Sequence, residues 1–190
     1  ACQECHADLY EAYTGTGHFH ALKRIVDAEE PEFPETEVSD PPEGYTWENV
    51  RYVIGGYAWK ARFVDQEGYI ITGEEGDTTQ FNLENSTLRT DEEWVPYHPG
   101  EQVPFDCASC HTTGYIAQGN QDGLPGLIGV WNEDKVGCEA CHGPGSNHVN
   151  DPYLVSVDIN RDQESCMSCH GEGVVEEIDP EAVFIQHHDS

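Results

Sequence analysis

Basic residues and methionine are scarce in this chain of 190 residues, which contains eight lysines and arginines and a single methionine, Met167. Because 37 aspartates and glutamates stand against the eight basic residues, the formal net charge at pH 7 is −29. Such a surface repels phosphate groups, which excludes nucleic acid as a partner. The sequence also lacks any run approaching the ~18 apolar residues that a membrane-spanning helix needs, so we do not expect an integral membrane protein.

Cysteine is confined to one pattern, Cys-x-x-Cys-His, and four copies of it use all eight cysteines. In this pattern two thiols can add to the vinyl groups of a haem, and the next imidazole binds its iron. Zinc knuckles, disulfides and thioredoxin-like redox pairs also use Cys-x-x-Cys, but none of them requires a histidine directly after the second cysteine. We therefore predict four covalently attached haem c groups. The attachment residues are Cys2, Cys5, Cys107, Cys110, Cys138, Cys141, Cys166 and Cys169, and the proximal ligands are His6, His111, His142 and His170.

Apolar residues make up only 37% of the chain, whereas globular proteins typically contain ~45–50%. Four haems would supply the missing hydrophobic mass. The predicted fold class is a multihaem cytochrome with mostly irregular loops and short helices wrapped around four haems, and a small antiparallel β-sheet in about 50–85. The length suits a single domain, 1–190. Within it we expect the first haem and N-terminal helices in 1–30, a small β insertion in 45–95 and a three-haem region in 100–190.

Local patterns give more detailed expectations. Residues 7–28 are expected to be helical around Leu9 to Tyr13 and again from Ala21 to Ala28. The Pro- and Glu-rich segment 30–44 is expected to be extended. Alternating apolar residues at 50, 52 and 54 predict the first strand of the sheet, and 65–68 predicts a turn within it. Further helices are expected at 162–169 and 180–188, with Asp162 and Asp179 as N-caps.

The distal side of each iron needs a second ligand. Met167 lies inside a Cys-x-x-Cys loop on the proximal side of its own haem, so it does not reach that iron's far face. Six histidines outside the motifs remain for four positions. His148 follows a tight Gly143-Pro144-Gly145 turn, and His18 follows the first helical stretch. The best candidates are His18, His148, His187 and His188, with His98 and His20 in reserve.

Complete bis-histidine ligation determines what such haems can do. An iron with both axial positions filled moves electrons and does not bind substrate. Because no methionine raises their potential, the haems are expected to be low-potential carriers. His187 and His188 are adjacent near the end of a helical pattern and point roughly 100° apart. One of them would serve this chain's haem while the other serves another haem or another subunit.

Thioether attachment takes place outside the cytoplasm, so the chain is expected to be exported. Ala1-Cys2 already begins the first motif, and the numbered chain therefore reads as a mature product whose targeting segment has been removed. We expect an extracellular or cell-surface location, with the periplasmic space as the alternative.

Three stretches resemble a family of exported multihaem cytochromes: 52–63 (YVIGGYAWKARF), 107–115 (CASCHTTGY) and 137–148 (GCEACHGPGSNH), together with the closing 184–188 (FIQHH). A tetrahaem chain of this size resembles the subunits of extracellular cytochrome filaments, the microbial nanowires. The resemblance implies haems stacked in a continuous line, with a histidine of one subunit completing a haem in the next. It also implies distal ligation by His18, His148, His187 and His188, whereas a histidine at position 20 departs from the pattern.

Three functions follow, in order of preference. The first is electron transfer as the repeating subunit of a conductive filament, with neighbouring subunits and either redox proteins or extracellular acceptors as partners. The second is a soluble tetrahaem electron shuttle of the periplasm or cell envelope. The third is a haem enzyme acting on small nitrogen oxides, which is disfavoured because distal histidines are in surplus. We therefore expect a carrier and not an enzyme.

Overall fold

The computed structural model of the chain describes residues 2–32, 38, 40–86, 89–157 and 163–170. The helices are α1 (Cys2–Cys5), α2 (Ala7–Thr14), α3 (Ala108–His111), the 3-10 helix η1 (Gln121–Gly123), α4 (Cys138–His142), α5 (Ser146–Asn150) and α6 (Gln163–His170). The strands are β1 (Leu22–Arg24), β2 (Val50–Gly55), β3 (Lys60–Asp65), β4 (Tyr69–Ile70), β5 (Gln80–Asn82), β6 (Glu93–Val95), β7 (Val103–Pro104), β8 (Ile116–Asn120) and β9 (Ile128–Val130). No helix in the described ranges has the length and apolar content to span a bilayer.

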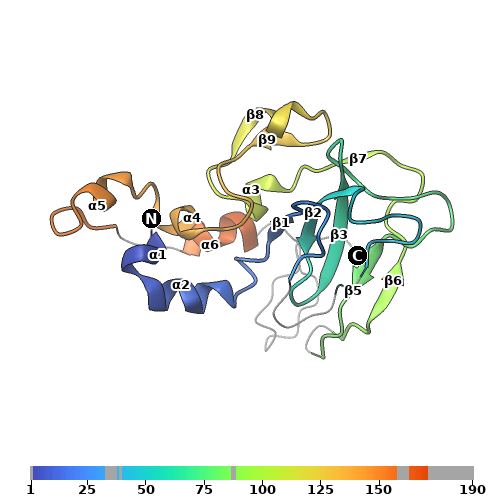
Figure 1. The fold of residues 1–190 in the computed structure, drawn as a ribbon, viewed down its shortest axis with the longest axis horizontal. Helices are drawn as coiled ribbons and strands as arrows, with labels where there is room; N and C mark the ends of the chain where they lie inside the picture. The colour runs from blue at the N-terminus through green and yellow to red at the C-terminus, as the bar shows by residue number, and fades with distance from the viewer. Residues whose placement is uncertain (1, 33–37, 39, 87–88, 158–162, 171–190) are drawn as a thin grey trace. The chain divides into compact units, whose positions relative to one another are not determined.

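Seven strands form one antiparallel sheet in the order β1-β2-β3-β4-β7, with β5 pairing with both β3 and β6. Figure 1 shows β2 and β3 as the long central strands. Their register pairs Val53 with Phe63, and β5 continues the ladder by pairing Phe81 with Ala61. The small antiparallel sheet predicted for about 50–85 is confirmed, and it also recruits strands at 22–24, 93–95 and 103–104 that the sequence patterns did not indicate.

Both faces of the sheet are buried. Because side chains alternate along a strand, neighbouring residues of β2 and β3 enter opposite apolar clusters. The first cluster contains Tyr52, Val64 and Phe105, which are 0% exposed, together with Trp131. The second is built on Val53, Ala61, Phe63, Ile71, Phe81 and Leu83, and Val38 from the Pro-rich segment joins it. The β region therefore has a protein core of its own.

A bulge in β2 changes the expected alternation. The register shifts between Val50 and Tyr52, so these residues do not point to the same face. Val50 belongs to the second cluster, whereas Tyr52 and Ile54 belong to the first. An inserted residue moves the following side chains to the other face, which a strict period of two does not anticipate.

The expectation of a helix from Ala21 to Ala28 was wrong. Leu22–Arg24 is β1, which pairs with β2 and places Leu22 in the first cluster at 1% exposure. Asp27 and Ala28 have φ angles of 54° and 57°, a left-handed conformation incompatible with a continuing α-helix. The first half of the expectation is confirmed by α2. Burial of Leu22 against the sheet outweighs the modest helix propensity of the segment.

After Gly100 the expected short helical turns are present as α3 to α6, but the hairpin β8–β9 was not expected. Helix α6 confirms the prediction for 162–169 apart from a shift of one residue. The predicted N-caps Asp162 and Asp179 and the predicted helix at 180–188 lie outside the described residues. The chain divides into two compact units, Ala1–Gly137 and Cys138–Ser190, each of which contains two of the four motifs. The single-domain layout and its three regions stay predictions.

The predicted turn at 65–68 is confirmed, and a close backbone contact holds it. Asp65 Oδ1 accepts hydrogen bonds from the amides of Glu67 and Tyr69, both at 2.9 Å. The turn packs against Gly126, whose amide donates to the carbonyl of Glu67. A Cβ at Gly126 would lie 2.4 Å from the backbone of Gly68, so only glycine permits this approach.

An ionic latch ties the loop at η1 to β1 and β2. Asp122 Oδ2 accepts from Arg24 at 3.0 Å and from Arg51 at 2.5 Å, and Arg24 Nε also donates to Asp134 at 2.7 Å. The hydrogen bond from Arg51, followed by that from Arg24, holds the pKa of Asp122 below its ordinary value of 3.8. This interaction stabilises the fold above the unfolded-state pKa, and the stabilisation is lost as the pH falls through the lower folded-state pKa.

We therefore predict that Asp122→Asn lowers the free energy of unfolding at pH 7 by about 1 kcal/mol, and that the difference from wild type shrinks below pH ~4. Asn tolerates the left-handed backbone at this position, where φ is 55°, so the variant removes charge without straining the loop. Urea unfolding at pH 7 and pH 3 measures the effect. Asp91→Asn at an exposed position is the control, and equal losses in both variants at pH 7 would contradict the latch.

Candidate haem sites

Each Cys-x-x-Cys-His motif lies on or directly beside one short helix: α1, α3, α4 or α6. A helical turn brings residues i, i+3 and i+4 to one face, so the two cysteines and the histidine of a motif share that face. In the first two motifs the bond that closes the turn is explicit. The amide of His6 donates to the carbonyl of Cys2 at 2.9 Å, and the amide of His111 donates to that of Cys107 at 3.1 Å. The local fold thus groups the donors that a haem c needs.

None of the eight cysteines forms a disulfide, and none of them is buried. Cys5, Cys141 and Cys166 are exposed, whereas Cys107 packs against the first apolar cluster. Burial there raises the pKa of the unmodified Cys107 thiol to about 11. The second motif therefore joins the sheet's core to the surface on which a haem would be attached.

His111 is oriented by a backbone carbonyl far away in the sequence. Its Nδ1 lies 2.6 Å from the carbonyl oxygen of Ala21. A carbonyl oxygen only accepts hydrogen bonds, so Nδ1 carries the proton and Nε2 keeps its lone pair. The same oxygen accepts the amide of Gly55 at 3.0 Å, which fixes it to the end of β2. Ligating histidines characteristically donate their other ring N–H in this way, so His111 fits the role of a proximal ligand.

His148, a predicted distal ligand, has the same ring arrangement. Its Nδ1 donates to the carbonyl of Val155 at 2.6 Å, which leaves Nε2 as the nitrogen with a lone pair. The bond closes a short segment that begins with α5, and the ring is partly exposed. This geometry suits an iron ligand.

His18 and His20 differ sharply despite their proximity. His18 is exposed on a turn whose carbonyl accepts the amide of Val136 at 3.1 Å. His20 is 3% exposed, and its Nε2 donates to the carbonyl of Thr14 at 2.9 Å. Burial lowers the pKa of His20 below 6.5, which keeps the ring neutral. His18 is open to a haem, whereas His20 offers a flat porphyrin no access.

His98 and three of the motif histidines lie at or near the surface. His98 has a φ of 46°, and its Nδ1 lies 3.4 Å from a carboxylate oxygen of Glu101. His6 is exposed, while His142 and His170 are partly exposed. His187 and His188 lie outside the described residues.

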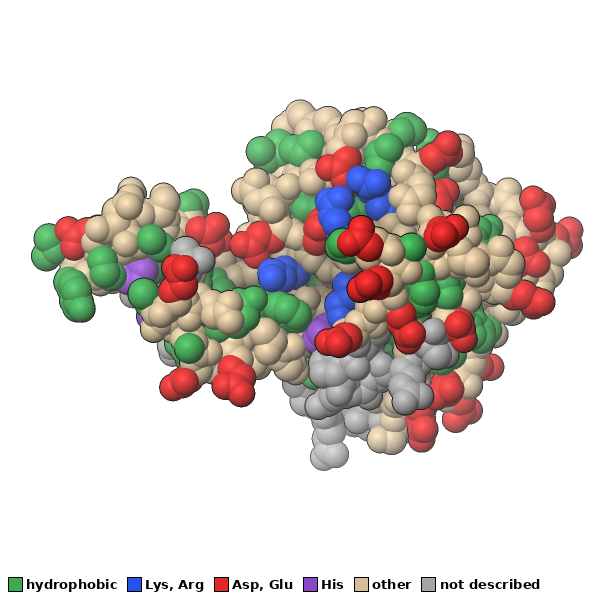
Figure 2. Space-filling view, viewed as in Figure 1, with side chains coloured by type: hydrophobic (Ala, Val, Ile, Leu, Met, Phe, Trp, Pro, Cys, Tyr) green, Lys and Arg blue, Asp and Glu red, His purple; other side chains and the backbone are tan. Residues whose placement is uncertain are grey.

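Large apolar side chains are exposed close to the first and third motifs. Leu9 follows the first motif in α2 and is 70% exposed, and Tyr153 and Leu154 in the second unit are 97% and 84% exposed. Figure 2 shows hydrophobic side chains at the surface around α5. A haem face is the kind of apolar surface that would cover such exposed side chains.

Most of the basic side chains of the described residues are occupied within the protein. Arg24 and Arg51 form the latch with Asp122, Arg62 stacks on Tyr97 at 3.8 Å, and Lys60 lies over Trp59 at 3.9 Å. Lys135 lies over the ring of Phe19 at 4.6 Å. Figure 2 shows acidic side chains across the visible face of the β region. The surface is therefore as anionic as the net charge suggests.

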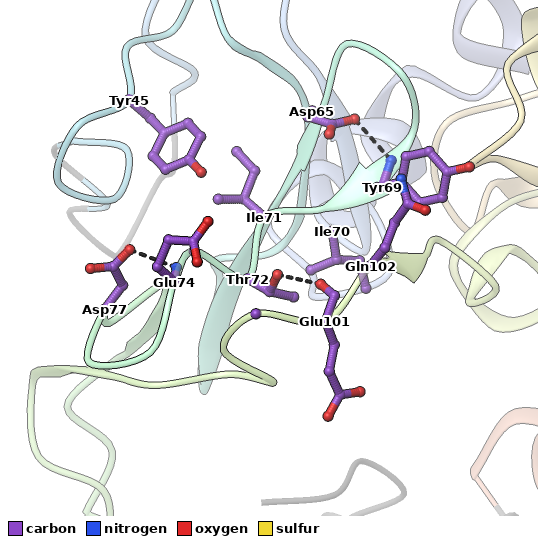
Figure 3. A pocket seen from close by; sticks show the side chains of 12 residues that line it. Tyr45, Asp65, Tyr69, Ile70, Ile71, Thr72, Glu74, Asp77, Glu101 and Gln102 are labelled. Carbon is purple, nitrogen blue, oxygen red and sulfur yellow. Dashed lines mark hydrogen bonds between the residues drawn. The ribbon is translucent and has the colours of Figure 1, made fainter.

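A hollow of about 300 Å³ beside the sheet has a different character. None of the described residues that line it is a cysteine or histidine. Figure 3 shows two of its carboxylates engaged with the backbone: Asp65 accepts from the amide of Tyr69, and Asp77 from that of Glu74. The Thr72 hydroxyl donates to the carbonyl of Glu101 at 2.6 Å. These hydrogen bonds order the loops that line the hollow, and its described lining offers no residue that could hold a haem.

The features that sequence reasoning missed are mainly backbone atoms. The carbonyls of Ala21 and Val155 decide which nitrogen of His111 and of His148 carries the lone pair. Every residue has a carbonyl, so no residue type marks these two in the sequence.

Comparisons with known proteins give consistent results. The protein family described as cytochrome c554 and c-prime matches residues 1–49 and 79–143, which include the first three motifs. The match leaves out 50–78, where β2 to β4 lie. No curated protein matches the chain.

Two solved structures share the fold. The outer cell wall cytochrome OcwA has 24% sequence identity and a TM-score of 0.58, over 89% of this chain and 36% of that one. The undecahaem cytochrome from the S-layer of Carboxydothermus ferrireducens has 23% identity and a TM-score of 0.56, over 90% of this chain and 24% of that one. This chain therefore spans well under half the length of either protein.

We predict that the holoprotein carries four haems and that replacing both Cys107 and Cys110 by serine removes one of them, because serine forms no thioether. Intact-protein mass spectrometry under denaturing conditions measures the loss as the mass of one haem. Ser109→Ala within the same loop is the matched control and is expected to retain all four. A wild-type mass without covalent haem would contradict the assignment of these motifs.

Proposed function

The chain belongs to the cytochrome c554 and c-prime family of multihaem c-type cytochromes, and from this premise we propose that it transfers electrons through four haem c groups with bis-histidine ligation. A bound haem would supply an iron that alternates between the ferric and ferrous states, and two histidine ligands would leave that iron no position for substrate. The chain's own residues attach each haem through two thiols and hold one motif histidine on the same helical face.

The orientation of His111 is the observation that carries this proposal. A ring anchored through Nδ1 presents Nε2 in a fixed direction, which reduces the cost of binding iron. His148 repeats the arrangement in the second unit. We assign the distal positions to His18, His148, His187 and His188, with His98 in reserve. Ligands of one chemical type at every iron favour a carrier over an enzyme acting on nitrogen oxides.

We further propose that the protein is exported and forms the repeating subunit of an extracellular filament. The two similar solved structures are those of an outer cell wall cytochrome and an S-layer cytochrome, which supports an extracytoplasmic site for this chain. The net charge of −29 opposes close packing of identical subunits, and salt weakens that repulsion. Ligation of a haem by a neighbour's histidine would offset the repulsion that remains. A soluble tetrahaem shuttle is the alternative.

Electron microscopy of the purified holoprotein separates the two forms. We expect thin, uniform filaments that are longer in high salt than in moderate salt, because screening reduces the repulsion between subunits. Dispersed single-chain particles at every salt concentration would contradict the filament and favour the shuttle.

The adjacent histidines near the end of the chain test the link between subunits. If one of them is donated to a neighbour's haem, His187→Ala or His188→Ala shortens or abolishes filaments and leaves a high-spin haem in the absorption spectrum. His98→Ala removes an exposed reserve histidine and is expected to retain both filaments and low-spin haem. Full-length filaments with all irons low-spin in both single variants would rule out ligation across subunits by this pair.

A further inference from the structure

His20 is the central contact of an aromatic cluster that fixes the segment after α2. Its ring stacks on Tyr57 with 5.3 Å between centroids and an interplanar angle of 2°, and meets the edge of Phe19 at 5.1 Å. Its Nε2 donates to the carbonyl of Thr14 at 2.9 Å, which closes the loop between the two residues. At 3% exposure the ring is sealed from solvent.

Neighbouring contacts secure the same loop. The hydroxyl of Tyr57 donates to the carbonyl of Gly15 at 2.7 Å. Tyr13 donates through its hydroxyl to the carbonyl of Val136 at 2.9 Å, and the amide of Val136 donates to the carbonyl of His18. The segment from Thr14 to Ala21 is therefore held at both of its ends and in its middle.

The fixed segment ends in the carbonyl that orients His111. His20 directly precedes Ala21, whose oxygen lies 2.6 Å from Nδ1 of His111. His20 also lies two residues after the exposed His18. One buried ring thus stands between two histidines assigned to haem irons and has no access to a haem itself.

We propose that His20 is a positioning residue, which holds the segment from Thr14 to Ala21 so that the Ala21 carbonyl keeps the proton on Nδ1 of His111 and directs Nε2 toward the haem iron. The proposal rests on the proposed function in taking His111 as an iron ligand. A hydrogen bond to Nδ1–H makes the imidazole a stronger electron donor, which favours ferric iron. Releasing the segment weakens that bond, so the haem of the second motif becomes easier to reduce.

Three variants separate the hydrogen bond of His20 from its packing. His20→Phe keeps a flat ring against Tyr57 but cannot donate to Thr14. His20→Gln places an amide donor near the position of Nε2 but loses the ring stack. Tyr57→Phe removes one hydrogen bond to the segment at a partly exposed position, so it tests the proposal even if His20→Phe does not fold.

The measurements are a spectroelectrochemical redox titration of the holoprotein and the spin state of its haems by electron paramagnetic resonance. In His20→Phe we expect four low-spin haems and an approximately tenfold change in the reduction equilibrium of one haem, an upward shift of about 59 mV, with the other three unchanged. His20→Gln is expected to restore most of the wild-type titration, and Tyr57→Phe to shift the same haem in the same direction by less.

Three results would overturn the proposal. A high-spin haem in His20→Phe, as expected for His18→Ala, would make His20 an iron ligand. Redox titrations identical to wild type in both His20→Phe and Tyr57→Phe would show that the segment does not affect the haem. An equal shift in His20→Phe and His20→Gln would show that His20 acts through packing and not through its hydrogen bond to Thr14. Failure of the proposed function is seen separately, as high-spin haem in the wild-type protein or an unchanged spin state in His18→Ala.

Discussion

A neutral imidazole has one lone pair, and in this protein backbone carbonyls decide which ring nitrogen keeps it. The carbonyls of Ala21 and Val155 occupy Nδ1 of His111 and His148, so Nε2 of each ring is the nitrogen available to iron. The carbonyl of Thr14 occupies Nε2 of His20 instead. The same kind of bond therefore leaves Nε2 unbonded to a carbonyl in two of these histidines and occupies it in the third, although all three look equivalent in the sequence.

The assignment at His111 depends on the sheet. The Ala21 oxygen also accepts a hydrogen bond from the amide of Gly55, the last residue of β2. Ala21 directly precedes β1, which pairs with β2. Those strands are fixed by two apolar clusters, one of which includes Phe105 and Ala108 beside the second motif. The protein core thus stabilises the strand, the strand fixes the carbonyl, and the carbonyl orients the histidine. Helix α3 of the second motif lies against this core, and its two cysteines stay partly exposed.

The chain's net charge of −29 is left with few unpaired basic side chains to offset it among the described residues. Arg24 and Arg51 pair with Asp122 at the partly exposed surface, and other basic side chains lie over aromatic rings. Long-range repulsion between copies of the chain is then strong at low salt and weak at high salt. An assembly of such subunits requires a short-range bond of greater strength, and the proposed iron–nitrogen bond between subunits has that property.

The features that depend on residue type alone could be predicted from the sequence. The four motifs predicted the clustering of thiols with a histidine, and the alternation in 50–85 predicted the central strands of the sheet. The sequence did not predict β1, because Lys23 and Arg24 are compatible with the exposed face of a helix. The strand forms because Leu22 is buried against the sheet. The sequence did not reveal the bulge after Val50, which depends on pairing with β3. The difference between His18 and His20 depends on a distant contact, because Tyr57, 37 residues after His20, stacks on the ring of His20.

Near-infrared magnetic circular dichroism of the oxidised holoprotein tests the ligand assignment most directly, since it reports the pair of axial ligands on each low-spin haem. We predict one class of signal, that of bis-histidine ligation, with an intensity that corresponds to all four haems. A high-spin component, or a signal from histidine–methionine ligation, would contradict it.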